Sequence, residues 1–220
     1  MSNNNIDRRN FLKVLSTGTA AASTGLLYGC GGDPKRQGVS QTGSYLGEVP
    51  TDKMTYRTNP HTGDKVSLLG YGCMRLPLRQ KADGSGEEID QEAVNALVDY
   101  AIAHGVNYFD VAPVYVRGLS EQATGLALSR HSRDKYFIAT KLSTHRPVPE
   151  WRTLEGSKGL FEQSLKNLRV DYIDYYLIHG VGLGGMDDLR KRLYDNGVLD
   201  FLLKERKAGR IRNLGWSFHG

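Results

Sequence analysis

Three short apolar runs, each followed by a polar residue where a strand would end, constrain this chain more than any other feature. The runs occupy residues 106–109, 136–140 and 172–178, and their composition is typical of buried strands. Asp110, Lys141 and His179 follow them. A charge beside a buried strand is costly unless a partner meets it. Because ligands and catalytic groups gather at the carboxyl ends of parallel strands, we expect these side chains to share one site.

Helix-favouring segments separate these runs. We expect one helix between Asp90 and Gly105 and others over 120–130 and about 157–169. A broken helical region over 187–208, interrupted at Asn196-Gly197, and a last strand over 211–217 follow. Asp90 can cap the first helix and Gly105 can end it. Its apolar face is expected to consist of Val94, Leu97, Val98, Ala101 and Ile102. The alternation predicts a parallel sheet with right-handed crossovers.

The segment before the first helix is less regular. Turn-forming residues at 59–64 lie between two strand-like runs and predict a hairpin. A Gly-rich first strand is expected over residues 67–73, where backbone can approach a ligand. Residues 77–88 carry turn signals and are expected to form a loop.

The residues around Asp110 resemble the aldo-keto reductases, and the resemblance extends over residues 68–218. It implies an α/β fold of the TIM (β/α)8 barrel type, with about five of eight strands in this chain, which we therefore expect to be the N-terminal part of a barrel. It also implies a catalytic tetrad of Asp110, Tyr115, Lys141 and His179. The matching residues are Gly105, Asn107, Phe109, Asp110, Ala112, Tyr115, Ser120, Glu121, Gly125, Thr140, Lys141, Ile178 and His179.

The family's chemistry is hydride transfer between NADP(H) and a small carbonyl or alcohol substrate. By resemblance, Tyr115 is the general acid. A lysine ammonium about 4 Å from a phenol oxygen favours the phenolate by roughly 4 kcal/mol at an effective dielectric near 20. Asp110 would keep Lys141 charged and positioned, and His179 would orient the substrate carbonyl through a hydrogen bond. Taken singly, each residue also fits a structural role as a core histidine, a solvated lysine or a loop cap.

The cofactor is expected to contact Gly72, Met74, Arg75, Asp110 and Ser217. Ser217 matches the family position that binds the nicotinamide carboxamide, but Phe218 follows where asparagine is common and cannot make the same hydrogen bond. Trp216 to His219, together with Val116, resemble a bacterial branch that often carries an iron–sulfur domain. A [4Fe-4S] cluster is therefore expected only if a C-terminal extension exists. The choice between NADP and NAD stays open.

The N-terminal region is similar to an export leader. The run DRRNFLK with an apolar stretch too short for a membrane span resembles a twin-arginine signal over residues 1–29, read by the twin-arginine translocase. The alternative is an amphipathic first helix. Leu27 to Cys30 resemble a lipoprotein box, so lipid anchorage at Cys30 and soluble release into the periplasm both stay open. Residues 30–53 predict a polar tether, and residues 54–220 the barrel part.

The charge and cysteine content argue against several other classes of function. The net charge of +5 would fall to +3 without the leader, because residues 1–29 hold three Lys/Arg and one Asp. This mild, dispersed charge argues against a nucleic-acid partner. With Cys30 lipidated, Cys73 would then be the one free thiol, and one cysteine cannot form an internal disulfide or hold a cluster. No short-spaced His, Cys or acidic cluster predicts a metal site.

Two alternatives remain for particular segments. Glycines at 180, 182, 184 and 185 mimic a dinucleotide-binding loop, but a Rossmann fold leaves Asp110, Tyr115 and Lys141 unexplained. Arg117 could bind an anionic substrate or be a solvated loop residue. The rival hypotheses for the whole chain are a non-catalytic barrel that binds a cofactor or ligand without turnover, and a truncated inactive product.

Overall fold

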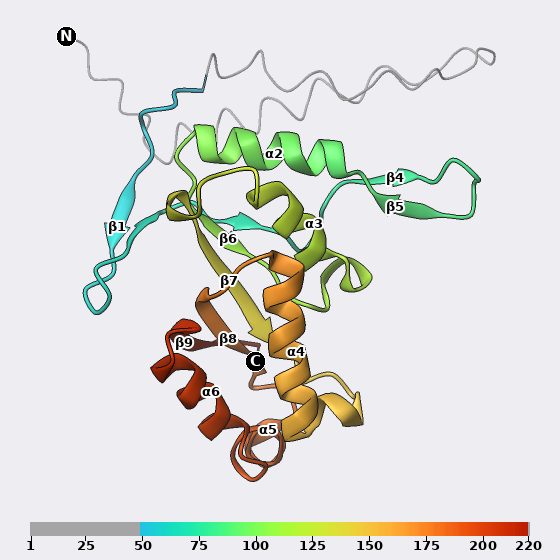
Figure 1. Cartoon of the computed structure of the whole chain (residues 1–220), viewed down its shortest axis with the longest axis vertical. Helices are drawn as coiled ribbons and strands as arrows, with labels where there is room; N and C mark the ends of the chain where they lie inside the picture. The colour runs from blue at the N-terminus through green and yellow to red at the C-terminus, as the bar shows by residue number, and fades with distance from the viewer. Residues whose placement is uncertain (1–48, 220) are drawn as a thin grey trace, which may run out of the picture. The chain divides into compact units, whose positions relative to one another are not determined.

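The computed structural model describes residues 49–219, and its centre is a five-stranded parallel sheet (Figure 1). The strands lie in the order β3 (Tyr71–Gly72), β6 (Tyr108–Asp110), β7 (Phe137–Leu142), β8 (Ile173–Val181) and β9 (Ile211–Phe218). Within this sheet the strands therefore follow one another in chain order, although the two strands of a separate hairpin lie between β3 and β6 in the sequence. The twin-arginine signal, Cys30 and most of the tether lie outside the described residues.

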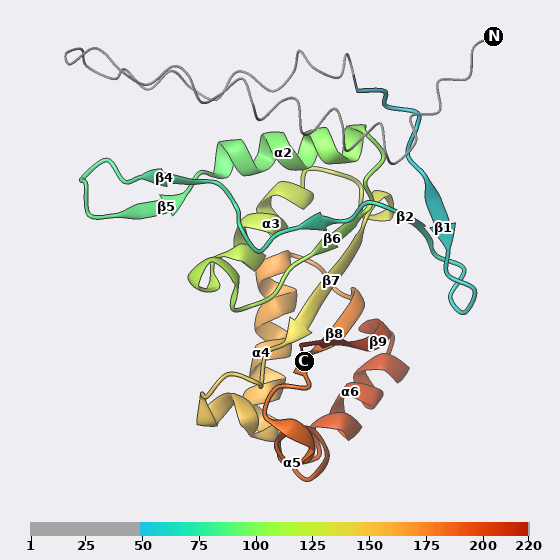
Figure 2. The ribbon, with the colours of Figure 1, turned by 180° about the vertical axis from the view of Figure 1, so that it is seen from behind.

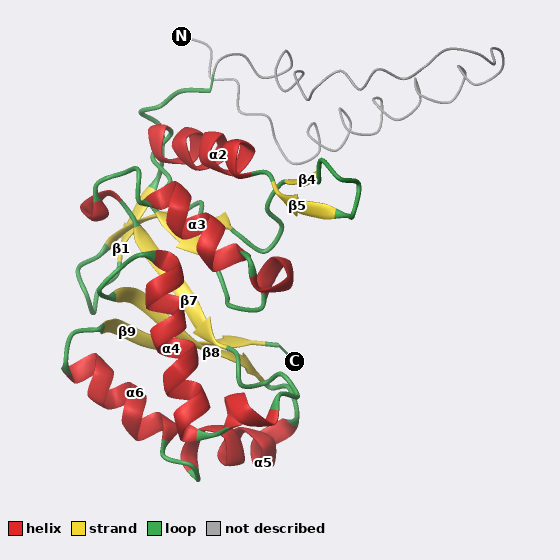
Figure 3. Cartoon of the chain, turned by 45° about the vertical axis from the view of Figure 1, so that its right-hand side comes forward, coloured by secondary structure: helices red, strands yellow, loops and turns green. Residues whose placement is uncertain are grey.

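Helices cover one face of this sheet (Figure 3). They are α2 (Gln91–Ala103), α3 (Ser120–Leu128), α4 (Leu154–Leu168), the short α5 (Gly185–Leu189) and α6 (Val198–Lys207). Successive helices pack side by side, α2 on α3, α3 on α4 and α4 on α6. Sequential strand order with helices on one face is the arrangement of a (β/α) barrel, of which the described residues contain five strands. Within residues 49–219, no helix is long and apolar enough to cross a membrane.

The strands alternate between a helix-covered face and a face that the described helices leave open. Ile138, Tyr176 and Ile178 are buried toward the helices, whereas Phe137 and Tyr175 are only partly buried on the other face. This alternation follows from the two-residue period of a strand. The apolar core consequently lies between the sheet and the helices, and the opposite face is available to position polar groups.

Local signals in the sequence define several element ends. Asp90 Oδ1 accepts a hydrogen bond from the Ala93 amide at 3.0 Å and caps α2, as predicted. Gly105 has φ +85°, a left-handed conformation that favours glycine. Gly125 allows α3 to approach α4, since a Cβ there would lie 2.3 Å from the Asn167 carbonyl oxygen. The predicted break at Asn196-Gly197 is also present between the π-helical turn Arg190–Tyr194 and α6.

Two antiparallel hairpins flank the sheet (Figure 2). The predicted hairpin is confirmed as β1 (Tyr56–Thr58) with β2 (Lys65–Ser67). The side chain of Asn107 fastens it to the start of β6: its Oδ1 accepts from the Ser67 amide at 2.8 Å, and its Nδ2 donates to the Lys65 carbonyl at 2.9 Å.

The second hairpin corrects the predicted loop over residues 77–88. This segment forms β4 (Leu78–Gln80) and β5 (Glu87–Ile89), and Arg79 pairs with Glu88 across the strands at 2.9 Å. The expected first strand over 67–73 is also too long, because Ser67 belongs to β2 and only Tyr71–Gly72 pair with β6. Polar, exposed strands lack the apolar alternation that makes a strand visible in a sequence.

Candidate active site

The four residues of the expected tetrad come from consecutive β–α connections. Asp110 ends β6, Lys141 is the penultimate residue of β7, and His179 lies near the end of β8. The parallel register pairs Asp110 with Ala139 and Lys141 with Leu177, so these carboxyl ends are adjacent. Tyr115 follows β6 in a short 3₁₀ turn, Tyr115–Gly118. The structure therefore brings all four side chains to one edge of the sheet.

Lys141 lies at the centre of this group. Its Nζ donates to Asp110 Oδ1 at 2.6 Å and to the Val111 carbonyl at 2.8 Å. Only 4% of the Lys141 side chain is exposed, compared with 36% of Asp110. The ammonium also lies 4.8 Å from the centroid of the Tyr115 ring. In the described part of the chain no hydrogen bond joins it to the Tyr115 hydroxyl, so its effect on the phenol there is that of a nearby charge.

The turn that carries Tyr115 has an unusual backbone. Val116 and Arg117 have φ of 47° and 55°, and Gly118 has φ of 90°. A β-branched residue in the left-handed region is rare because its Cβ crowds the backbone. Val116 nevertheless packs against the core beneath α3. Arg117 is 78% exposed and lies 3.9 Å from Glu87, as a solvated loop residue would.

His179 is buried beside three other polar groups. Its Nδ1 lies 2.8 Å from Ser143 Oγ, and its ring centroid lies 4.4 Å from that of His145 and 5.9 Å from that of Tyr115. Burial, together with the charges of His145 and Lys141, lowers the pKa of His179 to about 3. The imidazole is therefore neutral at neutral pH and can act as a hydrogen-bond donor without carrying charge.

Arg192 is fully buried and holds the backbone at His179 through hydrogen bonds. The sequence did not indicate this residue. Arg192 donates to the Gly180 carbonyl at 3.1 Å and to the His179 carbonyl at 3.4 Å, while Asp188 Oδ2 accepts from its Nε at 3.1 Å. The glycines at 180, 182, 184 and 185 all have positive φ and form the loop around this arginine. This assembly and the sequential strand order contradict a Rossmann fold, in which the strand order reverses.

The residues expected to contact a cofactor lie along the same edge. A Cβ on Gly72 would meet no atom within 4 Å, so the backbone there borders open space. Met74 and Arg75 are exposed at the end of β3. Ser217 Oγ accepts from the Gly180 amide at 3.1 Å and keeps its own proton for a further acceptor. The exposed Arg75 side chain and the Ser217 hydroxyl can each donate a hydrogen bond, so these residues fit a cofactor that carries acceptor groups.

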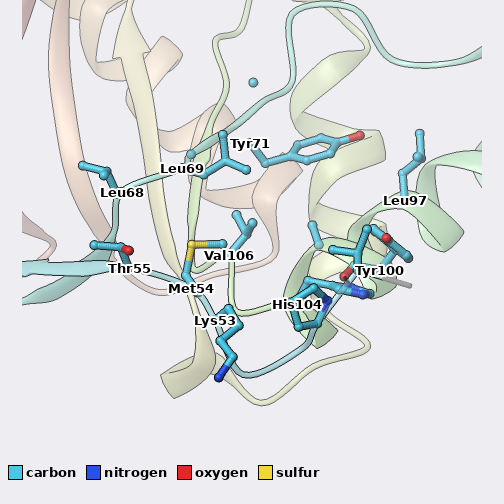
Figure 4. A pocket seen from close by; sticks show the side chains of 15 residues that line it. Lys53, Met54, Thr55, Leu68, Leu69, Tyr71, Leu97, Tyr100, His104 and Val106 are labelled. Carbon is cyan, nitrogen blue, oxygen red and sulfur yellow. Dashed lines mark hydrogen bonds between the residues drawn. The ribbon is translucent and has the colours of Figure 1, made fainter. Parts of the chain in front are cut away.

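A separate apolar cavity lies at the opposite edge of the sheet (Figure 4). It has a volume of about 820 Å³ and is bordered by Leu68, Leu69 and Tyr71 on one side and by Leu97 and Tyr100 of α2 on the other. Leu97, which belongs to the predicted apolar face of α2, is 43% exposed and borders this cavity. The lining includes both residues of β3, Tyr71 and Gly72, and Val106 before β6, but not Lys141, and we assign no catalytic role to it.

The comparisons with known proteins agree with this geometry. The model of the Aldo/keto reductase family matches residues 68–220, and the chain belongs to this family. Protein tas of Escherichia coli is 31% identical over 190 residues, covering 74% of this chain and 52% of that protein. L-galactose dehydrogenase of Arabidopsis thaliana is 29% identical over 167 residues, covering 74% and 48%.

Solved structures similar to this chain are also aldo-keto reductases. The holo form of aldo-keto reductase AKR11C1 from Bacillus halodurans superimposes with a TM-score of 0.59 at 30% identity, over 75% of this chain and 50% of that chain. The fold is thus that of the aldo-keto reductase TIM barrel. The chain spans about half the length of the relatives it matches.

Proposed function

We propose that this chain is the catalytic part of an exported oxidoreductase that transfers hydride between NADP(H) and a small carbonyl or alcohol substrate. The observation that carries the proposal is the buried Lys141 ammonium, which meets Asp110 at 2.6 Å and lies over the Tyr115 ring. A structural ion pair has no need of an adjoining phenol and imidazole. Membership of the aldo-keto reductase family supports the same activity.

In the direction of reduction, each residue has a separate task. Tyr115 donates the proton to the carbonyl oxygen, and the nearby charge of Lys141 stabilises the phenolate that remains. Asp110 holds Lys141 in place. His179, neutral at working pH, donates a hydrogen bond that orients the carbonyl and stabilises charge developing on its oxygen.

NADP(H), when bound, would supply or accept the hydride. Gly72, Met74, Arg75, Asp110 and Ser217 would hold it along the carboxyl edge of the sheet. The hydroxyl proton of Ser217, which the Gly180 amide leaves free, supports this assignment. Phe218 is 66% exposed, so its ring does not fill the edge. A [4Fe-4S] cluster belongs to the proposal only for a chain that continues beyond Gly220 with cluster cysteines.

The proposed location is the outer side of the cytoplasmic membrane. Its support is the sequence alone: the twin-arginine signal over residues 1–29 and the lipoprotein box ending at Cys30. Intact mass measurement of the native protein from the membrane fraction tests both. A chain that begins at Cys30 with added lipid supports anchorage, a chain that lacks the leader but carries no lipid supports soluble release, and an uncleaved cytoplasmic chain contradicts export.

The activity is tested on the native full-length protein. NADPH binding is measured by fluorescence, and turnover by NADPH consumption with a panel of small aldehydes and ketones. We expect Tyr115→Phe and Lys141→Met to lose at least about a hundredfold in kcat while NADPH affinity changes little. Failure to bind NADPH would overturn the proposal. NADPH binding without turnover in wild type or variants would favour the non-catalytic binding barrel.

A further inference from the structure

One hydrogen bond at the site involves a residue outside the tetrad. Ser143 is fully buried, and its Oγ lies 2.8 Å from Nδ1 of His179. It comes two residues after Lys141, so both side chains project from the same face at the end of β7. Ser143 therefore reaches the imidazole from the strand that supplies the ammonium.

The direction of this hydrogen bond follows from the buried donors. Within residues 49–219, the Ser143 hydroxyl makes no other side-chain hydrogen bond. If Nδ1–H donated to Ser143, the buried hydroxyl proton would have no acceptor, which is unfavourable. If the hydroxyl donates to Nδ1, both groups are satisfied. The single ring proton of the neutral imidazole is then on Nε2.

We propose that Ser143 is a positioning residue that holds His179 in the Nε2–H tautomer. The N–H thus lies on the nitrogen that Ser143 does not contact, where it is free to donate to a substrate oxygen. Nε2 makes no hydrogen bond to the described residues, which leaves this donor unused by the protein itself. The role rests on the proposed function, because it matters for catalysis only if His179 binds the substrate carbonyl.

The test compares Ser143→Ala with a matched control. Ser157 is also fully buried and donates one hydrogen bond, to the Trp151 carbonyl at 3.0 Å, but does not touch His179. Ser157→Ala therefore removes a similar buried interaction elsewhere.

The tautomer is measured by NMR. Histidine ring ¹⁵N is labelled in the full chain, and long-range ¹H–¹⁵N correlation spectra are recorded at pH 7. These report the tautomer of His179 without any substrate, and His179→Gln assigns its signal.

We expect wild type and Ser157→Ala to show the Nε2–H form, and Ser143→Ala to show a mixture or the Nδ1–H form. Ser143→Ala should also lower kcat about tenfold to hundredfold, with NADPH affinity unchanged. An Nδ1–H signal in wild type, or an unchanged tautomer in Ser143→Ala, overturns the proposal. If the tautomer shifts as expected but wild type shows no turnover, the proposed function fails while the positioning role of Ser143 stands.

Discussion

The ammonium of Lys141 and the carboxylate of Asp110 form an unequal ion pair. Their atoms lie 2.6 Å apart, yet 4% of the lysine side chain is exposed compared with 36% of the aspartate. The lysine has thus lost nearly all contact with water and depends on Asp110 and the Val111 carbonyl for compensation. Asp110 is the only carboxylate within salt-bridge distance of Lys141 among the described residues.

Asp110→Asn is expected to destabilise the chain by about 2–4 kcal/mol, because it leaves a buried ammonium without a counter-charge. Urea unfolding measures the change. The control is Glu155→Gln, which removes the exposed partner of Lys158 at 2.7 Å and should cost at most about 1 kcal/mol. Equal losses for the two variants would mean that Lys141 does not depend on Asp110 in this way.

Val116→Gly should be more stable than Val116→Ala by about 1 kcal/mol. Both variants lose the same packing of the valine against the core, but only glycine removes the strain of φ 47°. Denaturant unfolding of the two proteins gives the difference. If the alanine variant is the more stable one, the turn after Tyr115 is not strained in solution. Arg117→Gly, at φ 55° and on an exposed side chain, should gain stability for the same reason.

Glu121→Gln tests a buried carboxyl outside the site. Glu121 is fully buried and accepts hydrogen bonds from Thr140 at 2.6 Å and Asn167 at 3.3 Å, and burial raises its pKa. Between the ordinary carboxyl pKa of about 4.3 and the raised one, the unfolded chain binds fewer protons. Glu121 therefore makes stability fall as pH rises through that window.

We expect Glu121→Gln to remove this contribution. Its stability relative to wild type should rise with pH, by at most about 1.4 kcal/mol per pH unit. Unfolding curves for both proteins at several pH values between 4 and 8 provide the comparison. A difference that stays constant over this range would show that Glu121 ionises in the folded chain as it does in the unfolded one.

The effect of His179 on the pH dependence of stability is opposite to that of Glu121. Its pKa of about 3 lies below the ordinary value of about 6.5, so below pH 6.5 the unfolded chain binds the extra proton. The stabilising contribution is complete above pH 6.5 and declines toward pH 3, by at most about 1.4 kcal/mol per pH unit. His179→Gln should lose less stability than wild type between pH 7 and pH 5. Parallel curves for the two proteins would contradict the lowered pKa.

The order of the strands and the grouping of Asp110, Lys141 and His179 could be predicted from sequence because their signals are local, whereas the tetrad came from the family resemblance. A buried run followed by a polar residue indicates that a strand is near its end, and Asp110, Lys141 and His179 each show this pattern, although β7 and β8 continue to Leu142 and Val181. Parallel pairing then brings the three together without any knowledge of side-chain geometry. The tetrad's assembly in space is therefore a consequence of strand order.

Ser143, His145 and Arg192 were missed because their contacts depend on register and on a loop path. Arg192 lies in a helical segment of ordinary composition, and only the fold brings it to the carbonyls of His179 and Gly180. One sequence signal could have indicated Ser143: its position two residues after Lys141, which predicts a side chain on the same face of the strand. The β4–β5 hairpin escaped prediction because its strands bury little apolar surface.

Strand β7 carries Lys141 near its end, and Ser143 follows it on the same face. The ammonium beside the phenol and the hydroxyl beside the imidazole thus belong to residues only two positions apart on one segment. A tilt of this segment would disturb the charge near Tyr115 and the proton position on His179 at the same time.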